Sequence, residues 1–295
     1  MVAQVKRHPN EDDEVFVSRL NLLSGGAAAN TAYACAKLGL NTAFIGKLGL
    51  NDAFCKKIID DFNDIGVNTT LIKYSNEYGT GSAYVALNEK GDRRIYAHSG
   101  AANFLSKQDI IEEELASTQT FFLSSLKNLE PFIEAAKIGK KYEIPVILNP
   151  GMLIIEQGLK NIKPLLEKID ILILSQSEFQ TLIEQNIDDW NQKSIKDQTD
   201  FLLDLGIKIV IITTGKRGAV ILTPHNYRSI PPIEVSQVVD TTGAGDAFSA
   251  GFIYGFIQNL SFNFGDLTNN VRIGNYVAGN CIQQLGARNG IPELK

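Results

Sequence analysis

From residue 106 onward, short apolar runs alternate with longer segments of helical character. The run at 209–212 reads Ile-Val-Ile-Ile, and the segments 120–123, 145–148 and 171–174 are also largely apolar. Runs that are apolar at every position are typical of parallel strands that helices cover on both faces. The alternation therefore predicts an α/β fold with a doubly wound, mostly parallel sheet sandwiched by helices. Functional sites are expected beyond the carboxyl ends of its strands.

A glycine-rich turn bracketed by two acids leads into a strongly apolar segment. Residues 240–246 read Asp-Thr-Thr-Gly-Ala-Gly-Asp, and residues 247–257 are apolar nearly all round a helix. Gly243 and Gly245 carry no Cβ, so the backbone can bend sharply there and approach a ligand closely. A buried helix that starts in this way presents free N–H groups and the positive end of its dipole. The segment therefore predicts an anion site suited to phosphate.

Asp246, at the end of this turn, has two interpretations. An acid in the first turn of a helix is commonly only a cap or a partner of the helix dipole, worth ~0.3–1 kcal/mol. Here the acid lies in an apolar sequence beside the expected phosphate site. A carboxylate in that position can accept a proton from an attacking hydroxyl while the helix N-terminus stabilises the transferred phosphoryl group.

Two motifs resemble the signatures of the ribokinase-like, or phosphofructokinase-B type, carbohydrate kinases. Residues 240–246, with Phe248 and Gly251, resemble the C-terminal signature of that family. Residues 25–32 read Gly-Gly-Ala-Ala-Ala-Asn-Thr-Ala and, together with 45–52, resemble the N-terminal signature. The resemblance implies ATP-dependent transfer of the γ-phosphoryl group to a hydroxyl of a small sugar or sugar-like substrate.

The resemblance also implies the organisation of the chain. It suggests a single kinase domain over 1–295, with a small β lid formed by segments of about 12–24 and 78–98 inserted in it. Lids of this family often pair between subunits, so a homodimer through the lid is expected. The residues themselves predict helices at 27–38 and 106–117 and a strand at 41–47.

The resemblance assigns roles in catalysis and acceptor binding. It makes Asp246 the general base. The proposed anion hole consists of backbone N–H groups of Gly243, Ala244, Gly245 and Asp246. The acceptor would be held by Gly25, Gly26, Asn30 and Asn103. For Asn30 the local sequence fits equally well with a residue that caps its own helix.

Further roles concern the nucleotide and the metal ions. The residues expected to face ATP are Thr214, Gly215, Gly218 and Asn275. Glu178 would organise Mg²⁺ through water, since this ion favours oxygen ligands and retained waters; capping of the following helix is the alternative. Asp240 and Thr242, with the segment 286–288, resemble the loop that binds a monovalent cation such as K⁺ in this family.

Three features depart from the family pattern. Ala27 stands where ribokinases proper have Lys, which leaves other sugars and nucleosides open. Ser175 replaces the Asn of the family's Asn-x-x-Glu motif. The chain also begins too late for the first central strand of the family, so one core strand is expected to be missing. Two alternatives therefore accompany the sugar kinase: a nucleoside kinase of the same fold, and a non-catalytic ligand-binding relative, against which the intact Asp246 motif argues.

Composition excludes other classes of protein. The formal net charge of -5 argues against a nucleic-acid binder or a polybasic membrane binder. The longest apolar run falls far short of the ~20 residues that span a bilayer. The three cysteines, Cys35, Cys55 and Cys281, are widely spaced with no Cys-x-x-Cys, which argues against a disulfide framework or a zinc site and favours a cytoplasmic protein.

Overall fold

The computed structural model describes residues 1–89, 93–187 and 190–294. Its internal contacts divide the chain into two compact units. The first unit comprises Met1–Gly25 and Ala43–Leu105, and the second comprises Gly26–Thr42 and Ser106–Lys295. Within the described residues, no helix has both the length and the apolar character needed to cross a membrane.

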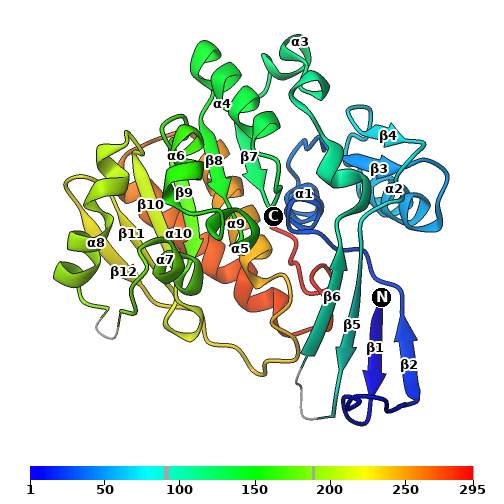
Figure 1. The fold of residues 1–295 in the computed structure, drawn as a ribbon. Helices are drawn as coiled ribbons and strands as arrows, with labels where there is room; N and C mark the ends of the chain where they lie inside the picture. The colour runs from blue at the N-terminus through cyan, green and yellow to red at the C-terminus, as the bar shows by residue number, and fades with distance from the viewer. Residues whose placement is uncertain (90–92, 188–189, 295) are drawn as a thin grey trace. The chain divides into compact units, whose positions relative to one another are not determined.

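The second unit is built on a six-stranded sheet with the order β12-β11-β10-β9-β8-β7 (Figure 1). The strands β7 to β10 are parallel, and β11 and β12 are antiparallel to their neighbours. This confirms the predicted mostly parallel sheet. The strands are β7 (Phe121–Ser124), β8 (Val146–Asn149), β9 (Ile171–Ser175), β10 (Ile209–Thr213), β11 (Ala219–Leu222) and β12 (Tyr227–Ile230).

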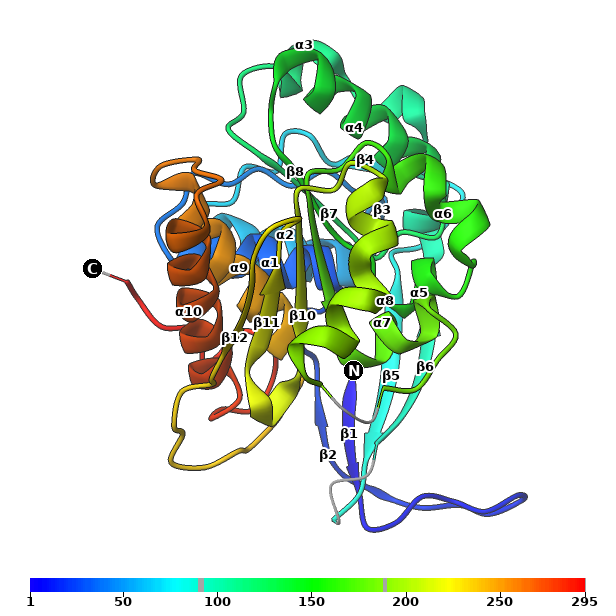
Figure 2. The same ribbon diagram turned by 90° about the vertical axis from the view of Figure 1, so that its left-hand side faces the viewer.

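Helices cover both faces of this sheet (Figures 1 and 2). One face carries α1 (Ala27–Lys37), α9 (Ala244–Ile257) and α10 (Phe264–Cys281). The opposite face carries α4 (Glu130–Tyr142), α5 (Met152–Ile155), α6 (Leu159–Leu166), α7 (Gln176–Leu182) and α8 (Gln192–Asp204). Alternate strand side chains, such as Ile147, Ile173 and Ile211, pack with α1, α9 and α10 in one buried cluster. The sandwich therefore follows from strands that are apolar on both faces.

The helices α9 and α10 approach each other at glycines. A Cβ on Gly251 would lie 2.8 Å from the carbonyl oxygen of Ile273, and a Cβ on Gly274 would lie 2.9 Å from that of Phe248. Both distances are below normal contact, so a side chain at either position would push the helices apart. The predicted buried helix over 247–257 is confirmed, and the close packing holds its first turn in place.

The first unit contains a four-stranded sheet with the order β2-β1-β5-β6. The strands are β1 (Val2–Val5), β2 (Val17–Asn21), β5 (Ser82–Leu87) and β6 (Arg93–His98). The strand β1 is antiparallel to β2 and parallel to β5, so it belongs to this sheet rather than to the six-stranded one. Between β5 and β6, residues 90–92 of the second predicted lid segment lie outside the described residues.

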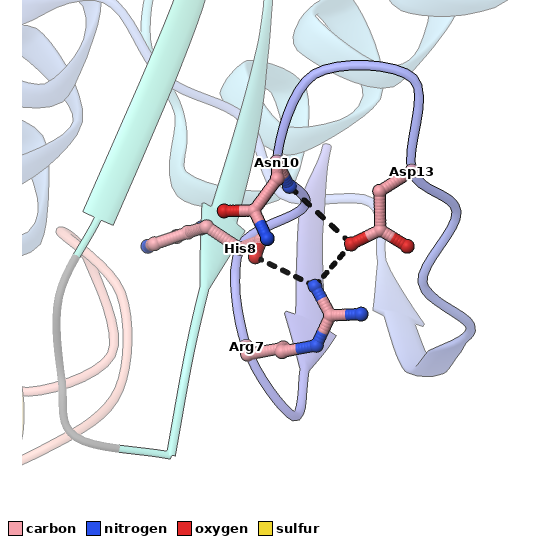
Figure 3. Close-up of polar contacts among 4 residues, drawn as sticks. All are labelled: Arg7, His8, Asn10 and Asp13. Atoms are coloured by element: carbon pink, nitrogen blue, oxygen red, sulfur yellow. Dashed lines mark hydrogen bonds and ion pairs between the residues drawn. The ribbon is translucent and has the colours of Figure 1, made fainter.

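An exposed ion pair closes the loop between β1 and β2 (Figure 3). The guanidinium of Arg7 donates a hydrogen bond to the carboxylate of Asp13 and a second one, of 3.3 Å, to the carbonyl of His8. The backbone N–H of Asn10 also donates to Asp13, at 3.3 Å. The hydrogen bond from Arg7 holds the pKa of Asp13 below its usual range. Because solvent screens such pairs, this contact orders the loop more than it stabilises the fold.

Two predicted elements are wrong. The helix expected over 106–117 is a 3-10 turn at Lys107–Asp109 and a short helix α3 (Glu112–Leu115). The extended β-branched residues Ile110 and Ile111 separate them. The strand expected over 41–47 is reduced to an isolated bridge between Ala43 and Asn68 and the strand β3 (Lys47–Gly49). Its partner β4 (Lys73–Ser75) offers only three residues for pairing.

Candidate active site

The start of α9 carries the glycine-rich turn. Gly243 is the N-cap residue and has a φ of 78°, which lies in the left-handed region that favours glycine. A Cβ on Gly243 would lie 2.4 Å from the Cβ of Ala287, so the turn also depends on close approach to a second loop. As the N-cap residue, Gly243 has no side chain that could cap this helix. Its first-turn N–H groups are therefore suited to an anion.

Asp246 lies in this first turn and is joined to α1. The Nδ2 atom of Asn30 donates a hydrogen bond of 2.9 Å to Oδ2 of Asp246. The hydroxyl of Thr31 donates to the backbone carbonyl of Asp246 at 3.4 Å. Asn30 and Thr31 are both buried. The two helices that carry the N-terminal and C-terminal motifs thus meet at this carboxylate.

Arg288 extends this contact. Its Nε atom donates a hydrogen bond of 3.0 Å to Oδ1 of Asn30. Its guanidinium carbon lies 4.9 Å from the centroid of the Tyr33 ring, a cation–π distance. Arg288 is only 8% exposed. A chain of contacts, buried at Arg288 and Asn30, therefore runs to Asp246.

These surroundings change the acidity of Asp246. Burial raises the pKa of its carboxyl to about 7, against the opposing effects of the hydrogen bond from Asn30 and the positive charge of Arg288. The negative charge of Glu178 raises the pKa further. A carboxyl that titrates near neutrality can both take up and release a proton under ordinary conditions, which is the requirement for general acid–base chemistry.

Each of the four parallel strands ends in a polar residue, and these follow in strand order: Ser124, Asn149, Ser175 and Thr213. In β8, β9 and β10 this residue comes two positions after an isoleucine of the cluster with α9, so it shares that face. Asn149 donates a hydrogen bond of 3.4 Å to the hydroxyl of Ser249, which donates one of 3.0 Å to the carbonyl of Gly245. The strand ends therefore support the first turn of α9.

Glu178 takes part in a capping box. Its Oε2 atom accepts a hydrogen bond of 2.8 Å from the backbone N–H of Ser175, and the hydroxyl of Ser175 accepts one of 3.2 Å from the N–H of Glu178. This is the capping arrangement that the sequence offered as the alternative role of Glu178. Ser175, which replaces the family's Asn, thus preserves the start of α7.

The turn between β10 and β11 contains three of the predicted nucleotide residues. Both the backbone N–H and the hydroxyl of Thr214 donate to the carbonyl of Gly218, at 2.8 and 3.0 Å. Gly218 has a φ of 86°, and a Cβ there would lie 2.1 Å from the carbonyl oxygen of Ile230. A Cβ on Gly215 would meet nothing within 4 Å. Gly218 is thus required by packing. Gly215 has a φ of 58°, which favours glycine, and leaves open space beside it.

Asn275, the fourth predicted nucleotide residue, is buried on α10. Its Nδ2 atom donates to the carbonyls of Ile230 and Pro231, at 3.3 and 2.8 Å. It therefore fixes the chain that follows β12, next to the residue that Gly218 approaches. The structure brings Asn275 together with the turn at 214–218 through this shared segment.

Asp240 connects the glycine-rich turn to the loop at 286–288. Its Oδ1 atom accepts a hydrogen bond from the N–H of Thr242, and its Oδ2 atom accepts one from the N–H of Gly286, both 2.9 Å long. The thiol of Cys281 lies 3.9 Å from the carbonyl oxygen of Thr242 and 3.5 Å from that of Ala287. The structure thus brings together the residues of the predicted cation loop.

Two predicted acceptor residues belong to the first unit. Gly25 is the last residue of its first segment, and Asn103 is exposed in a 3-10 helix at Gly100–Phe104. Gly26 begins the second unit and is the N-cap of α1, with a φ of 94°. Of the four residues expected to hold the acceptor, Gly26 and Asn30 therefore share the unit that contains Asp246.

Sequence reasoning missed several residues of this site. Ser124 and Ser249 gave no signal because single serines are common, and their significance lies in their positions at a strand end and in a helix. The sequence placed Arg288 only within the cation loop. Its buried contact with Asn30 joins residues 258 positions apart. The available signal was that Arg288 is a charged residue directly after two small residues, Gly286 and Ala287.

Comparisons with known proteins agree with this architecture. A family model described as pfkB family carbohydrate kinase matches residues 1–294. A ribokinase of Staphylococcus aureus is 32% identical over 294 residues, which cover 99% of this chain and 92% of the ribokinase. A deoxyribokinase of Salmonella typhimurium is 28% identical, with 88% of this chain and 83% of the relative covered. The structure of Arabidopsis thaliana ribokinase complexed with ribose and ATP has a TM-score of 0.86 and 28% identity, and covers 99% of this chain and 92% of that one.

The fold and the acid at the start of a buried helix define an α/β protein with a site for anion chemistry. The chain belongs to the pfkB family of carbohydrate kinases. The resemblance drawn from its two motifs is thereby confirmed, as is its membership of a class of enzymes that phosphorylate alcohol groups.

Proposed function

We propose that this protein transfers the γ-phosphoryl group of ATP to a hydroxyl of a small sugar, with Asp246 as general base. The observation that carries the proposal is the position of Asp246 in the first turn of α9, hydrogen-bonded to Asn30, with its pKa raised by burial to about 7. In this role the carboxylate takes the proton of the acceptor hydroxyl as its oxygen attacks the phosphoryl group. The N–H groups from Gly243 to Asp246 stabilise the charge on the transferred group.

The nucleotide is proposed to bind over the turn at 214–218. Gly215 leaves open space there, and Thr214 and Gly218 close the turn. Asn275 acts by holding the neighbouring segment after β12 rather than by offering its amide nitrogen to adenine, because that nitrogen already donates to two carbonyls.

Mg²⁺ fits this site as an ion that arrives with the phosphates. Within the described residues, no group of three or more His, Cys, Asp or Glu side chains is arranged to hold a metal ion directly. Glu178 uses one carboxylate oxygen in its cap, and we propose that the carboxylate also orders a water of the hydrated ion. When bound, Mg²⁺ neutralises phosphate charge.

K⁺ is proposed to bind at the loops joined by Asp240. The carbonyl oxygens of Thr242 and Ala287 both lie near the thiol of Cys281, so hard oxygen donors gather where the two loops meet. An ion held there would stiffen the turn that forms the anion hole. Asp240 itself supports this arrangement through its two backbone hydrogen bonds.

The acceptor is proposed to be a pentose or a similar sugar, held by Gly25, Gly26, Asn30 and Asn103. Its class is supported by relatives named ribokinase and deoxyribokinase. We further propose that both units belong to one kinase domain, with the segments of about 12–24 and 78–98 as its lid. Homodimer formation through the lid is supported by exposed apolar side chains on the first unit, namely Phe16, Leu20, Ile95 and Tyr96.

An assay of ADP release tests the proposed function. Wild-type protein with MgATP is offered D-ribose, 2-deoxy-D-ribose, other sugars and a set of nucleosides, beside the variant Asp246→Asn. We expect turnover with a sugar and a rate lower by ~10²–10⁴ in the variant, as for loss of a general base. Faster turnover of a nucleoside than of any sugar would assign the protein as a nucleoside kinase instead. ATP binding in calorimetry without turnover of any acceptor would refute the catalytic proposal.

A further inference from the structure

We infer that Arg288 is a positioning residue, which holds Asn30 in the one amide orientation that donates a hydrogen bond to Asp246. The inference rests on the proposed role of Asp246 as base. It concerns a residue that the sequence connected only with the cation loop. Arg288 acts on the base through Asn30: its Nε atom bonds Oδ1 of Asn30 at 3.0 Å, and Nδ2 of the same amide bonds Asp246 at 2.9 Å.

The chemistry of the two side chains makes the orientation unique. A primary amide has one accepting end and one donating end, and rotation by 180° exchanges them. A guanidinium is always protonated and can only donate, so it binds the oxygen end of Asn30. The NH₂ end must then face the carboxyl of Asp246. Burial of Arg288 and its stacking on Tyr33 fix the guanidinium in turn.

The orientation decides which form of Asp246 is favoured. A donated N–H bond stabilises the carboxylate, which is the form that acts as base. With the amide reversed, Oδ1 of Asn30 would face the carboxyl and would favour its protonated form. In the wild type, reversal of the amide would break the hydrogen bond from the charged Arg288 to Oδ1 of Asn30. Without Arg288 this penalty is absent, and the reversed amide becomes accessible. Loss of Arg288 thus raises the pKa of Asp246 in two ways, through the amide and through the lost positive charge.

The charged groups around Asp246 show why a cation is needed there. Glu178 on α7 acts on Asp246 with a negative charge, and Arg288 supplies the opposing positive charge. Cys281 on α10 also interacts with Asp246, but burial raises the pKa of its thiol to about 11, so that it is neutral. Asp240 acts on Cys281 from the glycine-rich turn. Among these charged groups, Arg288 is therefore the one that favours the ionised form of Asp246, and it adds to the effect of the hydrogen bond from Asn30.

The test measures the pKa of Asp246 directly by ¹³C NMR of protein labelled at the aspartate carboxyl carbons. The resonance absent from Asp246→Asn identifies the residue. In Arg288→Met, which keeps an unbranched side chain against Tyr33, we expect the pKa to rise by about one unit or more. Arg272→Met is the matched control, because Arg272 on α10 bonds only the neighbouring turn at Asn269 among the described contacts, and it should leave the titration unchanged.

A double-mutant cycle separates positioning from charge alone. If Arg288 acts through the amide, its replacement in an Asn30→Ala background must shift the pKa of Asp246 by clearly less than in the wild type. An equal shift in both backgrounds would overturn the positioning role, and an unchanged pKa in a folded Arg288→Met would overturn the inference entirely.

Arg288→Lys provides a second test if the Met variant does not fold. It keeps the charge but loses the planar Nε donor, so we expect a smaller upward shift in the pKa of Asp246. No shift would count against positioning.

The NMR titration needs no acceptor, so the two proposals can fail separately. A pKa that responds to Arg288 in a protein that phosphorylates nothing would leave the positioning intact and remove the kinase reaction. The opposite result is turnover that depends on Asp246 but not on Arg288, with the same pH profile in the wild type and in Arg288→Met. That result would support the kinase reaction and remove the positioning role of Arg288.

Discussion

Asn30 and Asp246 are 216 residues apart in sequence, and the amide of one donates a 2.9 Å hydrogen bond to the carboxylate of the other. Each lies in a helix that begins at a glycine with positive φ, Gly26 for α1 and Gly243 for α9. The two helix starts therefore bring the amide of Asn30 and the carboxylate of Asp246 to the same place. Three of the following predictions examine the parts of this arrangement, one examines the turn at 214–218, and one examines the sheet.

The pH dependence of catalysis should follow Asp246. Because burial raises the pKa of its carboxyl to about 7, the base is protonated at lower pH. We expect kcat/KM for the acceptor to fall about tenfold for each pH unit below 7 and to level off above it. The profile is measured under conditions of excess MgATP. A flat profile between pH 5.5 and 8.5 would contradict the assignment of the base.

Replacement of Asp246 should stabilise the protein at high pH while it lowers activity. The pKa of this carboxyl is higher in the folded state than in the unfolded one, so its stabilising contribution is present at low pH and is lost as the pH rises through about 7. Asn cannot ionise, so Asp246→Asn does not lose stability as the pH rises. Thermal unfolding should give a higher Tm than wild type at pH 8 and a similar Tm at pH 4. Asp13→Asn, at an exposed loop, is the control that should show no gain at pH 8.

Gly243→Ala should damage both the fold of the turn and the reaction. The new Cβ would lie 2.4 Å from Ala287 on a backbone with a φ of 78°, so we expect a cost of roughly 1–3 kcal/mol in unfolding free energy. Gly245→Ala is the matched control, since a Cβ there meets nothing within 4 Å. Urea unfolding compares the two variants. Equal stability would show that the turn tolerates a side chain at both positions.

The two glycines of the turn at 214–218 should differ in the same manner. Gly218→Ala places a Cβ 2.1 Å from the carbonyl oxygen of Ile230, whereas Gly215→Ala enters open space. Gly218→Ala should therefore displace the segment after β12, lower stability and weaken ATP binding. Gly215→Ala should cost about 1–2 kcal/mol, because its φ of 58° lies in the left-handed region, and this is less than the cost at Gly218. It should weaken ATP binding mainly by crowding the nucleotide. Calorimetric titration with ATP, beside thermal unfolding, distinguishes these outcomes.

Asp170 should matter for stability and not for the reaction. Its carboxylate accepts a 3.0 Å hydrogen bond from the buried N–H of Val146 and forms a 2.9 Å ion pair with Lys208. Asp170→Ala leaves the N–H without its acceptor, at a cost of about 1–3 kcal/mol. Lys208→Ala should cost about 1 kcal/mol or less, because Lys208 is largely exposed. Denaturant titrations give both values, and the kcat of each variant should match that of the wild type.

The sequence predicted the parts of the fold that depend on strong local patterns. Examples are the strands at 171–174 and 209–212 and the apolar helix from 247. Elements that are buried on all sides need apolar residues at nearly every position, so their sequence pattern is clear. The prediction of a helix at 106–117 was wrong because Ile110 and Ile111 adopt extended backbone. The average helical character of the whole segment does not reveal such a local break. The strand at 41–47 failed because its extent is set by a partner distant in sequence.

The same distinction holds for the site. The glycine-rich turn and Asp246 are encoded in seven consecutive residues, so sequence alone could predict them. The contact of Arg288 with Asn30, and that of Asn149 with Ser249, depend on distances between separate elements. No local pattern specifies such pairs, and side chains of these types occur throughout any sequence.

The separation of Asn30 from Asp246 and Arg288 also has a consequence for how the chain folds. Loop closure across more than two hundred residues is slow compared with helix formation, so the site is completed only when α1 docks on α9. During refolding, recovery of turnover should consequently lag behind recovery of helical signal in circular dichroism. A nascent chain that lacks the segment 286–288 contains Asp246 but not the arginine that contacts Asn30, so the contacts around this carboxylate are completed late in synthesis.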